Sequence, residues 1–94
     1  MLKYKDFTIL KIDEKTIGDI LYYDIIVIFD KFTKYIFEIT NIHFYNGKLV
    51  STLNIFLNKG NELDILSEES KEFERMKKFI QNFLRKYFME KKCN

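Results

Sequence analysis

The chain has 94 residues, of which 47% are hydrophobic and 32% charged. This composition excludes an intrinsically disordered protein, and the length predicts a single domain over residues 1–94. The formal net charge is only +2, so no global electrostatic field favours binding to nucleic acid or to a membrane surface.

The first two-thirds of the chain predicts β-structure, because runs rich in Ile, Phe and Tyr alternate with short polar segments. The expected strands lie at about residues 4–12, 17–29, 34–44 and 49–57, with a possible short strand at 63–66. Gly18 and Asp19 are expected to bulge or shorten the start of the second strand. We expect turns at residues 13–16, 30–33, 46–47 and 58–61. Asn46-Gly47 is the clearest, since both residues tolerate the positive φ angles of a type I′ hairpin turn.

The last third of the chain predicts one amphipathic helix over about residues 68–91. Apolar residues recur there at spacings of three and four, and Ser67 has the side chain of a helix N-cap. Consecutive strands joined by short turns make neighbouring strands antiparallel. The predicted fold is therefore α+β: an antiparallel meander of four to five strands packed on one long C-terminal helix.

The Asn-Gly turn also predicts which strand residues share a face of the sheet. It places Phe44 opposite Leu49, and a regular ladder then places Glu38 opposite Ile55. Ile36, Glu38 and Thr40 would accordingly face the helix. A buried carboxylate without a partner is costly, so Glu38 needs a partner or marks an error in this register.

The opposite face of the sheet would carry more apolar surface than a lone helix can cover. Its expected apolar zone consists of Ile26, Ile28, Tyr35, Phe37 and Phe56, with Ile39, Tyr22 and His43 at its border. Exposed together, these side chains would form a patch large enough to indicate a protein interface. The alternative is that the sheet curls, or that the first strand folds across the patch.

No catalytic, cofactor-binding or metal-binding residues are predicted. His43 is the only histidine, and the register places no carboxylate beside it, so it lacks the partners of a general base. One His and one Cys cannot close a metal site without carboxylates. We therefore expect a protein that is not an enzyme and needs no cofactor.

The polar side of the expected helix carries a set of basic residues. Its members are Lys71, Arg75, Lys78, Arg85, Lys86 and Lys92. They suggest binding to nucleic acid or to another anionic ligand, although a solvated helix face has the same composition. Membrane binding is disfavoured, because the sheet needs the apolar stripe of the helix for its own core.

The cellular setting is inferred from composition. The single cysteine, Cys93, cannot form an internal disulfide and suits a reducing compartment, and the N-terminus lacks the apolar run of a signal peptide. These features predict a cytoplasmic protein. Frequent Lys, Ile and Asn indicate an AT-rich coding sequence, which is compatible with a small phage-type inhibitor that blocks a host enzyme. The leading hypothesis is a homodimeric protein-binding module.

Overall fold

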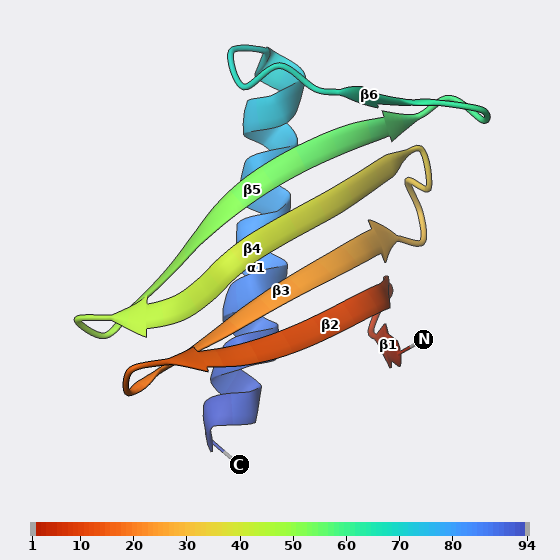
Figure 1. The fold of residues 1–94 in the computed structure, drawn as a ribbon. Helices are drawn as coiled ribbons and strands as arrows, with labels where there is room; N and C mark the ends of the chain where they lie inside the picture. Colours follow the sequence, from red (N-terminus) through yellow and green to blue (C-terminus); the bar gives the residue numbers. More distant parts are fainter. Residues whose placement is uncertain (1, 94) are drawn as a thin grey trace.

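The computed structural model describes the backbone of residues 2–93 and the side chains of residues 2–89. Over this range the chain forms a six-stranded antiparallel sheet with one helix packed on one face (Figure 1). The elements are β1 (Leu2–Tyr4), β2 (Phe7–Ile17), β3 (Ile20–Phe29), β4 (Tyr35–Tyr45), β5 (Lys48–Asn58), β6 (Leu63–Ile65) and α1 (Lys71–Cys93). The strands lie in the sheet in their order along the chain. The predicted α+β meander is confirmed, with one strand more than expected.

The additional strand comes from the N-terminal segment. The chain turns at Lys5, whose φ is 53°, so the expected strand at 4–12 is divided between β1 and β2. The turn expected at residues 13–16 is wrong, because β2 continues to Ile17, which pairs with Ile20. Gly18, with a φ of 63°, begins the two-residue turn between them and supplies the positive φ that such a turn needs. Gly18 and Asp19 do not bulge β3, but they shorten its start as expected, because β3 begins at Ile20 rather than at residue 17.

The Asn46-Gly47 turn joins β4 to β5 as predicted. Both residues have positive φ, 51° and 77°, and Phe44 pairs with Leu49. This pairing does not continue regularly along the two strands. Thr40 pairs with Thr52 and His43 pairs with Val50, so β4 contains one residue more than β5 over this interval.

The extra residue forms a β-bulge at Asn41. Its φ is 54°, in the left-handed region that Asn tolerates better than most residues. The pairing of β3 with β4 shifts at the same place, between Tyr23 and Ile25. A side-chain oxygen of Asp24 accepts the Asn41 backbone N–H at 2.8 Å, so this displaced donor has a partner.

The bulge exchanges the two faces of β4 on its N-terminal side. Tyr35, Phe37 and Ile39 point toward α1 and are 3%, 0% and 0% exposed. The prediction that these three residues lie on the uncovered face is therefore wrong. Ile36, Glu38 and Thr40 take their places on that face, which removes Glu38 from the core. The physical reason is that a one-residue shift reverses the side-chain alternation of a strand.

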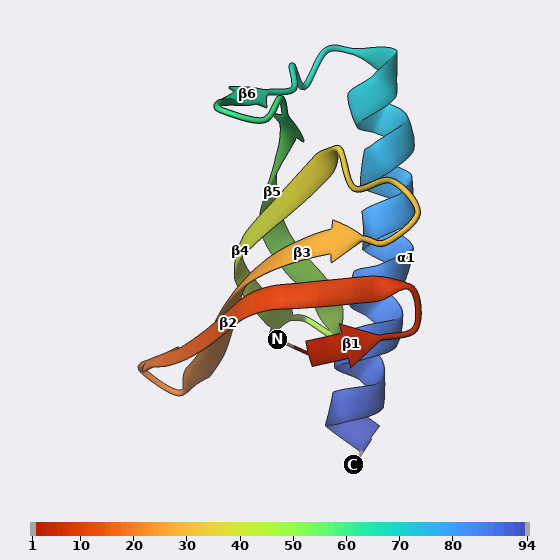
Figure 2. The same ribbon diagram turned by 90° about the vertical axis from the view of Figure 1, so that its right-hand side faces the viewer.

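The core lies between the sheet and α1. The sheet contributes buried aliphatic residues such as Ile25, Val27 and Ile55, and the helix contributes Ile80 and Leu84. Aromatic rings join the two layers: the centroids of Phe7 and Phe83 lie 4.3 Å apart, and those of Phe29 and Phe79 lie 4.5 Å apart. Figure 2 shows the helix along one side of the twisted sheet.

The helix begins three residues later than the sequence indicated. Ser70, not Ser67, is its N-cap, because the Ser70 hydroxyl accepts the Phe73 backbone N–H at 3.0 Å. Ser67 begins the preceding turn, where its carbonyl accepts the Ser70 backbone N–H at 3.1 Å. Two serines three residues apart give similar sequence patterns, and the chain uses the second.

Tyr35 connects β4 to the first turn of α1. Its hydroxyl donates a hydrogen bond to the Glu72 carboxylate. Burial, together with the negative charge of Glu72, raises the pKa of Tyr35 above its ordinary value of 10.0. The folded state thus holds this proton more tightly than the unfolded chain. Its stabilising contribution is complete below about pH 10 and is lost as the pH rises further.

We expect Tyr35→Phe to lower the free energy of unfolding by about 1 kcal/mol at neutral pH, since the variant loses one hydrogen bond to a charged group. The variant should also lose the part of the alkaline destabilisation that Tyr35 causes. Urea titrations near pH 7 and pH 11 measure both effects. Equal alkaline losses in the native protein and the variant would contradict this assignment.

Candidate protein interface

The sheet face that α1 leaves uncovered, the open face, faces the viewer in Figure 1. Four apolar side chains, the apolar row, cross it from β3 to β6. They are consecutive cross-strand partners: Ile28 pairs with Ile36, Ile36 with Phe56, and Phe56 with Ile65. Ile65 is 64% exposed, and the other three are half-buried. Directly paired side chains lie close enough to touch, so the row forms a continuous apolar strip.

A more polar line of residues runs beside the apolar row. Ile26 pairs with Glu38, and Glu38 pairs with Asn54. The Asn54 amide donates a hydrogen bond of 3.1 Å to the Glu38 carboxylate. Glu38 therefore has the partner that a partly buried carboxylate requires, and it has it on the open face rather than in the core.

The far end of the open face is organised around the bulge. His43 Nδ1 lies 2.7 Å from the Asn41 carbonyl oxygen. Since a carbonyl oxygen can only accept, Nδ1 carries the hydrogen of this bond. The ring of Tyr22 lies beside the imidazole, with centroids 4.7 Å apart. Asp24 binds Asn41, and its other oxygen lies 3.8 Å from Lys15 Nζ. These contacts give His43 a structural role in holding the bulge.

The sequence-predicted interface residues are divided between two environments. Tyr22, Ile26, Ile28, His43 and Phe56 lie on the open face, whereas Tyr35, Phe37 and Ile39 lie in the core. Two members of the apolar row, Ile36 and Ile65, are not among the predicted interface residues. A regular β4 ladder places Ile36 in the core, and only the bulge at Asn41 brings it to the open face. Ile65 lies on β6, a strand too short for its side-chain alternation to be evident from the sequence.

The basic residues of α1 lie on the outer side of the helix, and Arg85, at the border of this side, also lines a pocket between α1 and β5. Lys71, Arg75, Lys78, Arg85 and Lys86 are all exposed, and the Lys92 side chain lies outside the described residues. Within the described side chains, none of these five makes an ion pair. They are spaced along one side of a regular helix, as cations on a solvated face are.

No three His, Cys, Asp or Glu side chains among the described residues are grouped so that they could hold a metal ion. In the same part of the chain, no helix has the length and apolar character needed to cross a membrane. Comparison of the chain with protein-family models, with curated proteins and with solved structures gave no match.

Proposed function

We propose that this protein is a small, non-enzymatic, cytoplasmic protein-interaction module that pairs with a second copy of itself through the open face. The observation that carries this proposal is the apolar row, because α1 shields only the other side of the sheet. Contiguous apolar surface left uncovered by the fold is characteristic of interaction sites.

The arrangement of the open face favours a second copy as the partner. A dimer with a two-fold axis must present the same patch from both subunits. If that axis runs along the strands between β4 and β5, Ile36 lies over Phe56 of the second copy and Ile28 lies over its Ile65. Every member of the apolar row then meets another apolar residue.

The neighbouring polar residues obey the same symmetry. Glu38 lies over Asn54 of the second copy, which pairs a carboxylate acceptor with an amide donor. Thr40 lies over Thr52. Aligned sheets pack about 10 Å apart, so side chains from both open faces would interdigitate.

The available area is adequate for a stable dimer. The molecule measures 39 × 28 × 21 Å along its principal axes, and the open face forms one of its broad sides (Figures 1 and 2). A specific interface needs roughly 800 Å² from each partner. A sheet face of this extent supplies that area without any contribution from α1.

Phe56→Asp is the direct test of this interface. The substitution places a charge at the centre of the apolar row, and we expect it to convert the dimer to a monomer in light scattering. Thr16→Asp, on the exposed end of β2, adds the same charge away from the row and should leave the dimer intact. Circular dichroism shows whether both variants stay folded.

A native protein that is monomeric at high micromolar concentration would overturn this proposal. A stable complex with a different protein that Phe56→Asp removes would instead assign the open face to a heterologous partner, as a phage-type inhibitor would need. Light scattering and binding measurements at several salt concentrations test the other alternative, which is binding of nucleic acid. Apolar association changes little with salt, whereas nucleic-acid binding through the basic side of α1 would weaken steeply.

A further inference from the structure

β5 has a free edge over more than half its length. β6 pairs only with Phe56, Leu57 and Asn58, and just beyond it the Leu66 N–H donates to the Ile55 carbonyl at 2.8 Å. Within the described residues, no strand pairs with the outer edge of β5 between residues 48 and 54. Unpaired N–H and C=O groups along a strand edge are a template for adding another strand.

The free backbone groups can be assigned to particular residues. In an antiparallel sheet, alternate residues of a strand direct their N–H and C=O groups to the same side. The Ile55 carbonyl points outward, toward Leu66. Leu53, Ser51 and Leu49 therefore also direct their backbone groups outward, at the spacing that a new strand requires.

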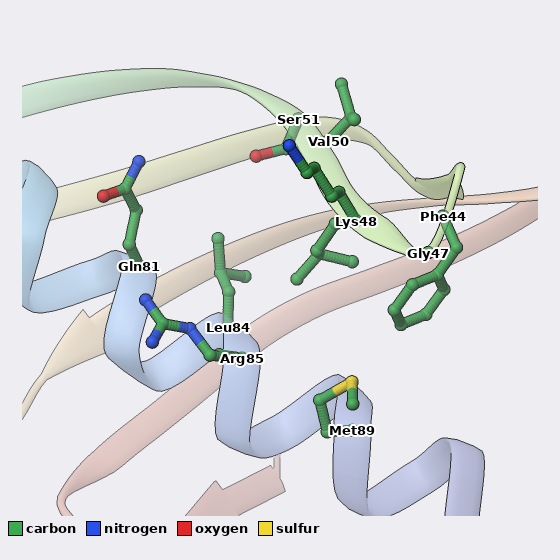
Figure 3. Close-up of a pocket in the computed structure, with 10 residues that line it drawn as sticks. Phe44, Gly47, Lys48, Val50, Ser51, Gln81, Leu84, Arg85 and Met89 are labelled. Carbon is green, nitrogen blue, oxygen red and sulfur yellow. The ribbon is translucent and has the colours of Figure 1, made fainter.

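A groove lies between this edge and α1. It consists of two adjoining pockets of about 610 and 310 Å³, which share Ser51, Gln81 and Leu84 in their walls. Figure 3 shows Leu84 pointing from the helix, and Phe44 from the hairpin, into the space between them. The tip of the β4–β5 hairpin lies to one side of the helix (Figure 1). Side chains of an added strand would have apolar walls to pack against.

The two ends of the groove carry different charges. Lys48 and Arg85 line the larger pocket, near the Asn46-Gly47 turn. Glu68 and Glu74 line the smaller pocket, near the start of α1, together with Lys77. The groove thus distinguishes the two directions in which a peptide with one acidic end could lie.

We propose that the β5 edge binds an extended segment of another protein as an added antiparallel strand. The segment continues the line of β6, so its C-terminal end lies beside Lys48 and Arg85. This places apolar side chains at alternate positions in the groove and acidic groups at the C-terminal end of the segment. Main-chain hydrogen bonds supply affinity, and the pockets supply specificity.

The competing occupant of this edge is a second copy of the chain. Antiparallel pairing of two β5 edges about Ser51 would place the basic end of each groove beside the acidic end of the other. The effect of Ser51→Pro on the oligomeric state distinguishes this arrangement from an added segment of another protein. This site is separate from the open face and does not depend on the proposed dimer.

The test uses a synthetic peptide with alternating Val and Thr that ends in two Asp residues. Binding is followed by amide chemical shifts and hydrogen exchange of Leu49, Ser51 and Leu53, with the native protein and with Phe56→Asp. We expect the native protein and the Phe56→Asp variant to bind the peptide equally well. In both proteins the amides of Leu49, Ser51 and Leu53 should become protected from hydrogen exchange. A peptide of the same composition with its two Asp residues at the N-terminal end should bind about tenfold more weakly.

Backbone N-methylation of the peptide tests strand addition without changing the protein. Methyl groups on the amides that face β5 should abolish binding, whereas methyl groups on the opposite amides should leave it unchanged. Equal binding of the two methylated peptides, or no binding of the parent peptide at millimolar concentration, would overturn this proposal. A dimer that Ser51→Pro dissociates, but Phe56→Asp does not, would instead assign the edge to a second copy.

Discussion

Truncation of Phe37 to alanine should lower the free energy of unfolding by about 3 to 5 kcal/mol, the usual cost of removing a buried phenylalanine. Phe37 is 0% exposed, and so are its cross-strand partners Val27 and Ile55. The ring therefore occupies a position enclosed on both sides in the sheet and covered by α1. Domains of this size have total stabilities of about 5 to 15 kcal/mol, so this one substitution should remove a large part of the total.

Ile36→Ala is the matched control on the same strand. Ile36 lies on the open face and is half-buried, so its truncation should cost about 1 kcal/mol. Urea unfolding followed by circular dichroism gives both values. Carrying both changes in the Phe56→Asp background removes any contribution from association. If Ile36→Ala proved the more damaging of the two, β4 would have the regular register that the sequence alone suggests.

Deletion of Asn41 is expected to abolish the native fold. Without this residue the pairing of β4 with β5 becomes regular. If the Asn46-Gly47 turn still joins the two strands, Tyr35, Phe37 and Ile39 then point away from α1. Either Glu38 enters the core, at the cost of burying a carboxylate, or the hairpin must slip by one residue. Both alternatives lose several kcal/mol, which is comparable to the total stability of the domain.

Two substitutions at the same position separate backbone geometry from strand length. Asn41→Gly should leave stability nearly unchanged, since glycine adopts the observed φ of 54° without strain. Asn41→Val should cost about 1 to 2 kcal/mol, because a β-branched residue is disfavoured there. Thermal unfolding and amide NMR spectra report all three changes. A deletion variant with native-like spectra would refute the role given to the bulge.

Much of the fold could be predicted from the sequence because its determinants are local. The Asn46-Gly47 turn needs only two residues of the right type, and the apolar spacing of α1 is visible from Phe73 to Phe88. The side-chain alternation of β3 and β5 was also predicted correctly, which is why Ile28 and Phe56 were placed on the open face. None of these inferences depends on contacts between distant parts of the chain.

The bulge could not be derived in the same way, because Asn is common in turns and strand ends as well as in bulges. The sequence nevertheless contains one sign of the bulge, which is the position of Glu38. A regular ladder placed Glu38 in the core without a partner, and the structure resolves this conflict through Asn54. The composition of the apolar row depends on the same event, so Ile36 could be found only after the shift was known. Ile65 could be placed in the apolar row only once the pairing of β6 with β5 was known.

The bulge divides β4 into two halves under opposite selective constraint. Before Asn41 the odd-numbered residues, such as Phe37 and Ile39, must remain apolar, whereas after it the even-numbered Ile42 and Phe44 face the helix. In a library of single substitutions, the positions of β4 that do not tolerate polar residues would change from odd-numbered to even-numbered residues at Asn41. Functional variants alone would thus reveal the irregularity of the backbone, and a one-codon insertion or deletion in this strand would be far more harmful than most missense changes.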